Sequence, residues 1–503
     1  MAVQYIKLWK LLFDRGMKKT DLISLAGIST NILAKLGKNE YVSMESLEKI
    51  CNALNCQIED IMEFVGNEMK REKEESSIRE KKVLSLFSSA GIGELGIKKL
   101  GLSILVSNEL VPIRCELYQE NYPEVKNVCG DIWEKQEEIL QEWRLRCNES
   151  PFLIYATPPC QGMSSNGAGK LLNEIRKGNR KPEDPRNRLI IPTMNIVKSL
   201  KPLWVLFENV PTMNNTIIRD EQGEYINIID YISKSLGDDY IGKAEVVNCA
   251  DYGIPQMRKR LITIFTRDVN GKKYLKKNGT LLPPRTHSEE PTLFTRQWMT
   301  LRDAIGELPP LDAQKGKNKN TEFNPWHYVP VMNKEKYWWM KNTPEGCTAY
   351  NNQCVNPSCM YTGNKLHGST IEDGTHTSNK DTPIYCERCG QLLPRPTVID
   401  KKTGVRRLIK GYDTAYRRME WDKPAATLTQ NFIFEASDKK VHPSQTRVLS
   451  IYEALILQTI AEYPYSLTIQ GKPITKNLCA QIIGESVPPK IIEIICKNIL
   501  SIT

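Results

Sequence analysis

The chain of 503 residues lacks any run of 18 or more apolar residues, the length that a helix needs to cross a bilayer. Its first ten residues are amphipathic and lack the apolar core of a secretory signal. Both absences predict a cytoplasmic protein without a membrane partner. In that compartment the 14 cysteines are expected to be reduced thiols, metal ligands or catalytic groups rather than a disulfide framework.

Positive charge is concentrated in one part of the chain. The net charge is +10, and residues 267–440 hold 28 Lys and Arg against 19 Asp and Glu. Because phosphate contacts supply most sequence-independent affinity for nucleic acids, this region favours a polyanionic partner. Positive charge alone is also typical of a solvated surface, so the choice between a nucleic-acid-binding region and such a surface depends on the motifs.

The first 66 residues predict a small all-α domain. Thr20, Ser29 and Ser43 are placed to cap helices, and Ala26-Gly27-Ile28 would join two of them as a helix-turn-helix. The first of five expected helices starts at Ile6, and the others cover residues 21–25, 30–36, 44–54 and 58–64.

This stretch resembles the Cro/repressor-type helix-turn-helix domain over most of its length. The resemblance implies DNA binding through exposed residues of the second motif helix, namely Ser29, Thr30, Asn31 and Lys35. A helical packing or dimerisation module is the alternative. Pairing of such domains would make the protein a dimer rather than a monomer.

The rest of the chain divides by its hydrophobic pattern. After a charged linker at 67–82, strands and helices alternate in residues 83–266, which predicts an α/β catalytic domain with a mostly parallel, doubly wound sheet. Residues 267–440 show little periodicity and predict an irregular inserted domain. Helical patterns return in residues 441–503, which are expected to complete the catalytic domain.

A glycine-rich turn, Ser88 to Gly96, follows the expected strand 83–87. Glycines at such a turn let the backbone approach a ligand. A second strand, 104–107, leads to Glu109, about 20 positions on, where an acid can bind ribose hydroxyls. The turn alone is equally typical of a structural connection, but Glu109 favours a nucleoside ligand.

Two further strands end in chemically useful groups. Cys160 follows the apolar strand 152–155 in a proline-stiffened loop, and Glu208 follows the apolar strand 203–207. Neighbouring strand ends converge on one crevice in open α/β sheets, and a nucleophilic cysteine needs a partner that handles protons. Cys160 alone is more typical of a buried structural thiol and Glu208 alone of a surface carboxylate. Only the two together, at these strand ends, indicate a catalytic site.

With these features, the chain resembles the DNA (cytosine-5)-methyltransferases. Pro159-Cys160-Gln161 resembles the catalytic loop of that family, Glu208-Asn209-Val210 its glutamate motif, and residues 256–260 its Gln-x-Arg-x-Arg motif. Residues 447–458 resemble the helix that organises target recognition, and residues 484–489 the last motif, which returns to complete the cofactor pocket. Ser89 and Glu485 stand where the family usually has glycine and asparagine, and Gly162 where proline often follows the catalytic motif.

The resemblance implies a Rossmann-like sheet that binds S-adenosylmethionine, an inserted target-recognition domain and duplex DNA as substrate. The implied catalytic residues are Cys160, Glu208, Arg258 and Arg260. The implied cofactor residues are Phe87, Ser88, Ala90, Gly91, Gly93, Glu109, Asp131, Ile132, Pro159, Glu485, Ser486 and Val487. Candidate DNA contacts, besides the helix-turn-helix residues, are Gln161, Arg395, Arg406, Arg407, Lys410, Arg417 and Arg418.

It also implies a covalent mechanism on a base flipped out of the duplex. Cys160 would attack carbon 6 of cytosine, so that carbon 5 becomes nucleophilic enough to take the methyl group. Glu208 would hold the N3 edge and relieve charge as the adduct forms, with Arg258 and Arg260 stabilising negative charge.

Four cysteines in the basic region have the spacing of metal ligands. Cys354-x4-Cys359 is followed after 26 residues by Cys386-x2-Cys389, which suits a tetrahedral structural zinc ion. Free thiols in a loop-rich insert are the alternative. Cys347, His367 and His376 are possible replacement ligands.

Two other functions stay open. The helix-turn-helix could be the main activity of a transcriptional regulator, or could repress the gene of the enzyme itself. The catalytic motifs could also serve an RNA cytosine methyltransferase, although the basic insert favours duplex DNA. A DNA enzyme would accompany a restriction endonuclease, or would be solitary or phage-borne.

Overall fold

The computed structural model describes residues 2–65, 81–159, 184–372, 375–378, 381–409, 414–437 and 439–503. These form two compact units, one within residues 1–80 and one within residues 81–503. The predictions for Cys160, Gln161, Gly162, Lys410 and most of the charged linker concern positions outside the described residues. None of the helices described combines the length and apolarity that a bilayer crossing requires.

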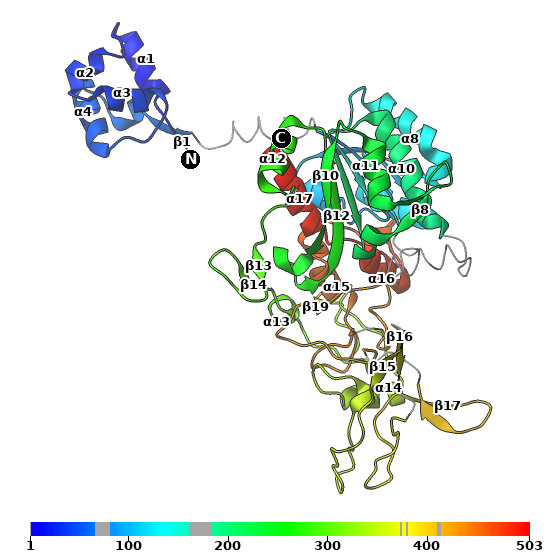
Figure 1. Cartoon of the computed structure of the whole chain (residues 1–503). Helices are drawn as coiled ribbons and strands as arrows, with labels where there is room; N and C mark the ends of the chain where they lie inside the picture. The colour runs from blue at the N-terminus through cyan, green and yellow to red at the C-terminus, as the bar shows by residue number, and fades with distance from the viewer. Residues whose placement is uncertain are drawn as a thin grey trace. The chain divides into compact units, whose positions relative to one another are not determined.

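The N-terminal unit is a bundle of short helices around one apolar core. Leu8, Leu22, Leu36, Leu47 and Ile50 are among the residues buried in that core. The helices are α1 (Ile6–Asp14), α2 (Asp21–Ala26), α3 (Thr30–Gly37) and α4 (Met44–Leu54) (Figure 1).

Two of the three predicted caps of this unit are confirmed. The hydroxyls of Ser29 and Ser43 accept hydrogen bonds from the backbone N–H groups of Ile32 and Ser46, at the starts of α3 and α4. Thr20 makes no side-chain capping bond, and its backbone is already helical, so that prediction is wrong. A capping side chain normally needs extended backbone at its own position.

The predicted fifth helix is also wrong. Residues Ile58–Asp60 form a single 3-10 turn, and β2 (Glu63–Val65) then pairs antiparallel with β1 (Ala2–Gln4). Val3 is buried in the helical core, which holds the N-terminal segment close enough to pair. The pairing satisfies backbone groups at both ends, which local helix propensity could not foresee.

A seven-stranded mixed sheet organises the second unit. Its strand order is β10-β12-β7-β6-β3-β4-β5, in which β12 runs antiparallel to both of its neighbours, β10 and β7, and the other six strands all run in one direction. The predicted mostly parallel sheet is therefore confirmed. The strands are β3 (Lys82–Leu86), β4 (Ser103–Glu109), β5 (Lys126–Cys129), β6 (Leu153–Ala156), β7 (Trp204–Asn209), β10 (Ile241–Asn248) and β12 (Lys259–Thr266).

Helices cover both faces of this sheet. Figure 1 shows α8, α10 and α11 on one side, where their apolar residues form one large core with the sheet, and α12 and α17 on the other. Burial on both faces explains why the central strands read as continuous apolar runs. The helices are α6 (Leu95–Lys99), α7 (Pro112–Asn121), α8 (Ile132–Arg146), α10 (Ile190–Leu200), α11 (Ile228–Leu236), α12 (Val269–Asn278) and α17 (Pro489–Ile502).

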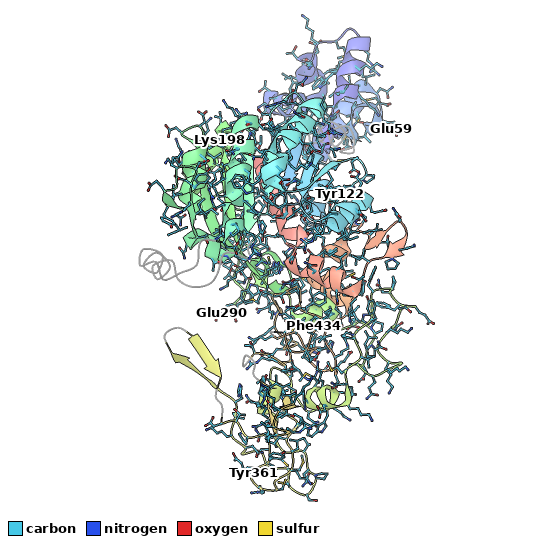
Figure 2. All side chains as sticks on the ribbon, turned by 90° about the vertical axis from the view of Figure 1, so that its right-hand side faces the viewer. Glu59, Tyr122, Lys198, Glu290, Tyr361 and Phe434 are labelled. Carbon is cyan, nitrogen blue, oxygen red and sulfur yellow. The ribbon has the colours of Figure 1, made fainter. Side chains whose placement is uncertain are left out.

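Much of the region that follows α12 consists of irregular chain with short elements. It lies beyond one end of the sheet and includes the segment around Tyr361 (Figure 2). Among its described residues the apolar clusters are small, and one of them surrounds Trp339, Tyr350 and Tyr416. Its elements are α13 (Leu301–Ile305), α14 (Lys334–Lys341), β13 (His287–Ser288), β14 (Arg296–Gln297), β15 (Ser369–Glu372), β16 (Thr375–Ser378), β17 (Thr397–Ile399) and β18 (Arg406–Leu408).

The chain then returns to the sheet beside the point where it left. β19 (Ala425–Ala426) pairs with β11 (Gln256–Met257), and α15 (Ile451–Leu457) and α16 (Lys476–Glu485) follow. The Gln256 amide donates to the carbonyl of Leu457 and accepts from the N–H of Leu428. One buried side chain therefore joins three segments that are far apart in sequence.

Candidate active site

A cavity of about 400 Å³ opens at the carboxyl ends of β3, β4, β6 and β7. Ligands bind at this edge in open α/β sheets, and the volume suits a small organic cofactor. Ten of the twelve predicted cofactor residues line it, and Ala90 and Gly91 do not. The ten are Phe87, Ser88, Gly93, Glu109, Asp131, Ile132, Pro159, Glu485, Ser486 and Val487.

The glycine-rich turn forms one wall and lies tightly against aromatic rings. Gly91 has φ +82°, and a Cβ atom there would come within 2.4 Å of the Tyr122 ring. A Cβ atom on Gly93 would come within 2.6 Å of the Tyr155 hydroxyl oxygen. Only glycine fits at these two points, so the turn keeps its backbone close to the cavity.

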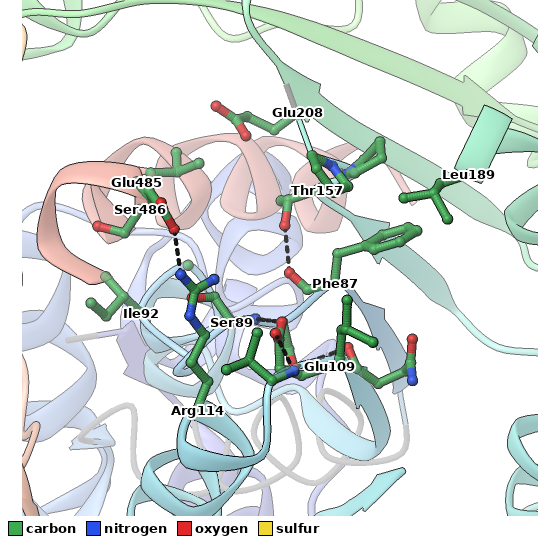
Figure 3. A pocket seen from close by; sticks show the side chains of 18 of the residues that line it. Phe87, Ser89, Ile92, Glu109, Arg114, Thr157, Leu189, Glu208, Glu485 and Ser486 are labelled. Atoms are coloured by element: carbon green, nitrogen blue, oxygen red, sulfur yellow. Dashed lines mark hydrogen bonds and ion pairs between the residues drawn. The ribbon is translucent and has the colours of Figure 1, made fainter. Parts of the chain in front are cut away.

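Glu109 is fixed in an orientation that suits a ribose. Its carboxylate oxygens accept hydrogen bonds from the N–H groups of Ser89, at 2.8 Å, and Val111, at 2.9 Å (Figure 3). Each oxygen keeps a lone pair for a ligand hydroxyl. Asp131 lines the cavity and caps α8 by accepting from the N–H of Trp133.

Glu208 and Arg260 meet at another side of the same cavity. Arg260 Nε lies 2.7 Å from Glu208 Oε1, and both side chains are largely buried. Burial raises the pKa of Glu208, while the nearby guanidinium groups of Arg260 and Arg258 oppose that rise. The result is a carboxyl group that holds a proton more readily than a solvated glutamate.

The start of the predicted catalytic loop is tied to the neighbouring strand ends. The Asn209 amide donates to the carbonyl of Pro158 at 2.8 Å, and the Thr157 hydroxyl donates to the carbonyl of Phe87 at 2.9 Å. Pro159, the last residue described before Cys160, lines the cavity. These two hydrogen bonds therefore fix the segment that reaches the cavity at Pro159, immediately before Cys160.

Arg258 binds backbone carbonyl groups and does not line the cavity. Its terminal nitrogens donate to the carbonyls of Leu428, at 2.7 Å, and Ser486, at 2.6 Å, and it is almost fully buried. The prediction that it acts directly on the reacting groups is corrected to a positioning role. It places the last motif against the cavity.

An ion pair that the sequence did not predict closes one end of the cavity. Arg114 Nη2 lies 2.7 Å from Glu485 Oε2, and both residues line the cavity. Glu485 was expected there, whereas Arg114 was not. Glu485 itself was a sequence signal for such a residue, because a carboxylate at a position usually held by asparagine is expected to have a positively charged partner.

Two of the candidate DNA-contact arginines are buried. Arg418 donates to the carbonyls of Met340, Thr343, His442 and Gln445, and burial lowers its pKa to about 10. Arg395 is fully buried, and burial lowers its pKa to about 10 as well. The structure therefore leaves neither guanidinium group exposed for a DNA contact, because both bind backbone carbonyls within the irregular region.

The other candidate contacts that the structure describes remain accessible to different extents. Arg407 is exposed and pairs with Asp400, whereas Arg406 and Arg417 are half-buried. In the N-terminal unit, Ser29, Thr30, Asn31 and Lys35 are all exposed at the beginning of α3 or along it.

Four cysteine sulfurs gather in the irregular region. The Sγ atoms of Cys354, Cys359, Cys386 and Cys389 all lie within 4.8 Å of one another. Of the possible replacements, His367 instead bonds the Thr382 hydroxyl and Cys347 is exposed outside the group, while the side chain of His376 is not described. Four thiols at this spacing match the donor set of a tetrahedral zinc ion.

The doubly wound sheet and its cavity define an S-adenosylmethionine-dependent methyltransferase of the Rossmann-like type. Residues 81–501 match the C-5 cytosine-specific DNA methylase family, and residues 7–67 match the Cro/C1-type helix-turn-helix DNA-binding domain. The chain belongs to the C-5 cytosine-specific DNA methylase family and is a DNA (cytosine-5)-methyltransferase with an N-terminal helix-turn-helix domain.

Two Type II methyltransferases agree with this assignment. The Type II methyltransferase M1.HgaI of Avibacterium volantium is 31% identical over 431 residues, covering 83% of this chain and 98% of its own. M1.HphI of Haemophilus parahaemolyticus is 25% identical, with coverage of 83% and 86%. Among solved structures, the transcriptional regulator VanUg is 55% identical over 12% of this chain and 83% of its own, with a TM-score of 0.12.

Proposed function

We propose that this enzyme methylates carbon 5 of cytosine within one short sequence of duplex DNA, through a covalent adduct with Cys160. The Glu208–Arg260 pair carries the proposal, since it lies on the same cavity as Pro159, immediately before the thiol. A buried carboxyl group beside a nucleophile is the pair of groups that this chemistry requires.

The cavity suits S-adenosylmethionine, which supplies the methyl group when bound. Glu109 would accept hydrogen bonds from the ribose hydroxyls, because both of its oxygens are already oriented by backbone N–H groups. Asp131 and Ile132 would hold the adenine, and the tight turn that contains Gly93 would leave room for the rest of the molecule.

On the substrate, the Cys160 thiolate would attack carbon 6 of a flipped cytosine and form a carbon–sulfur bond. The ring electrons then move toward carbon 5 and N3, and Glu208 would give or share a proton at N3 as negative charge develops there. Its raised pKa favours that role. After methyl transfer, loss of the carbon-5 proton to a base breaks the bond to Cys160 and restores the aromatic ring.

Expression of the wild type and Cys160→Ala in a methylation-free bacterial host, followed by bisulfite sequencing, tests this proposal. We expect protected cytosines in one short motif with the wild type alone. Protection by the variant would remove Cys160 from the mechanism. Methylation of transfer RNA without methylation of DNA would replace the substrate by RNA.

The names of the relatives support a place in a restriction-modification system. The enzyme would then protect host DNA from a partner endonuclease that recognises the same sequence. A digest of DNA from the expressing host with endonucleases that recognise the motif found by sequencing checks this role. Cleavage at that motif by every such enzyme would favour a solitary or phage-borne function.

The N-terminal domain would bind DNA through the exposed face of α3 and repress the gene of the enzyme. Thr30, Asn31 and Lys35 are accessible there, whereas the Ser29 hydroxyl is engaged in capping. A gel shift of the upstream DNA with the full chain should weaken strongly on Lys35→Glu. Equal binding by Cys160→Ala would show that this contact is independent of catalysis.

The four-cysteine group would hold a structural zinc ion. The apolar cluster around it is very small, so metal ligation would supply stability that packing does not. Elemental analysis should give one zinc per chain for the wild type and for Cys347→Ser, whose thiol lies outside the group. Cys386→Ser should lose the metal, and a metal-free wild type would contradict the proposal.

A further inference from the structure

The Arg114–Glu485 pair has more binding capacity than its own contact uses. Only one oxygen of Glu485, Oε2, meets Arg114; the other, Oε1, is buried and has no hydrogen-bond partner among the described residues. Among the residues that the structure describes, the Arg114 guanidinium is hydrogen-bonded to Glu485 alone. A buried carboxylate oxygen without a partner costs free energy unless a ligand satisfies it.

The pair also stands at a defined place in the cavity. Figure 3 shows Glu485 and Arg114 on the side of Ile92, whereas Leu189 and Phe87 lie on the opposite side, with Glu109 between Arg114 and Phe87. If Glu109 holds the ribose and Asp131 the adenine, a nucleoside with a long 5′ substituent extends that substituent toward Arg114 and Glu485. This placement rests on the proposed cofactor.

We infer that Arg114 and Glu485 together bind the zwitterionic amino-acid end of the cofactor. Arg114 donates to the α-carboxylate, and Glu485 Oε1 accepts from the α-ammonium group. The two protein charges are opposite and adjacent, as are the two ligand charges, so each charge gains a partner without changing the net charge of the cavity. Charge-assisted hydrogen bonds of this kind are the stronger ones in proteins.

The inference explains why the carboxylate at position 485 can replace the usual asparagine. A lone glutamate would repel the α-carboxylate of the ligand. Arg114, in the first turn of α7, neutralises that charge and adds a guanidinium group that can donate to the α-carboxylate. Arg114 and Glu485 therefore act together as one recognition site.

Two ligands separate this role from general damage to the cavity. S-Adenosylhomocysteine carries the amino-acid end, whereas 5′-methylthioadenosine has the same nucleoside and sulfur without it. We expect Arg114→Met and Glu485→Gln each to weaken binding of S-adenosylhomocysteine about 10- to 100-fold, with binding of 5′-methylthioadenosine within about twofold of wild type. Isothermal titration of the full chain measures both, and Arg146→Met, which breaks an ion pair on α8, is the matched control.

The double variant Arg114→Met/Glu485→Gln decides between recognition and mere charge balance. If the pair only balances charge, removing both charges restores affinity for S-adenosylhomocysteine, whereas a recognition role leaves it as weak as in the single variants or weaker. Restored affinity, or equal losses on both ligands in the single variants, would overturn the inference. A wild type that binds neither ligand would instead overturn the proposed cofactor.

Discussion

Arg260 lies diagonally across from Glu208 on the two neighbouring strands β12 and β7, with its guanidinium 2.7 Å from the carboxylate. Glu208 stands opposite Ile262, and side chains two positions apart on a strand share a face. The register of an antiparallel strand pair therefore places a cation beside the one carboxyl group that the mechanism needs. The cation limits how far burial raises the pKa of Glu208.

Glu208→Gln should slow methyl transfer about 10²- to 10⁴-fold, because the amide cannot give up a proton as charge develops at N3. Single-turnover methylation of a target duplex measures the loss. Affinity for S-adenosylhomocysteine should stay within about twofold of wild type. Glu138→Gln, on the surface of α8, is the control, and an unchanged rate in Glu208→Gln would remove Glu208 from the mechanism.

Arg418→Met should destabilise the irregular region by at least about 3 kcal/mol, since four carbonyls lose their donor. Arg407→Met should change stability by less than about 0.5 kcal/mol, because Arg407 is exposed. If Arg407 contacts a phosphate, its variant should lower the salt dependence of DNA binding by about one unit of slope. Thermal unfolding and salt-dependent binding measure the two effects, and equal stability of the two variants would contradict the structure.

Gly91→Ala and Gly223→Ala form a matched pair in the glycine-rich turn and in a surface turn. Both glycines have positive φ, +82° and +87°, so both variants carry similar backbone strain. Only the alanine at 91 would collide with a ring, that of Tyr122, whereas nothing lies within 4 Å at 223. We expect Gly91→Ala alone to lose cofactor affinity, at least tenfold by titration. Similar affinities would mean that the turn can move away from Tyr122.

Glu94 gives stability a defined pH dependence. Burial raises its pKa to about 7, although the Ser85 hydroxyl donates to it. The folded state therefore binds this proton more tightly than the unfolded state. The stabilisation is complete below about pH 4.5 and is lost as pH rises through about 7, which amounts to roughly 3 kcal/mol.

Glu94→Gln removes that titration while keeping an acceptor for Ser85. Between pH 5 and pH 8, the unfolding midpoint of the wild type should fall relative to that of the variant. Thermal unfolding in matched buffers measures the difference. Parallel pH profiles for the two proteins would show that Glu94 does not titrate in this range.

Local sequence signals predicted the sheet well because the central strands are short apolar runs buried on both faces. Ser29 and Ser43 were found for the same reason, since a cap depends on neighbouring residues. The strand β2 and the burial of Arg418 were missed, because both depend on partners far away in sequence. Ten of the residues that line the cavity were predicted as cofactor residues from motifs, whereas Arg114 matches no motif and is recognised only by its ion pair with Glu485.

The cavity joins residues 87–94 to residues 485–487, which are separated by most of the chain. A ribosome that adds about 5 to 20 residues per second needs roughly 20 to 80 s to make the roughly 390 residues between them. Throughout that interval one wall of the cavity does not exist. The growing polypeptide is therefore inert as a modifying enzyme until residues 485–487 have been made.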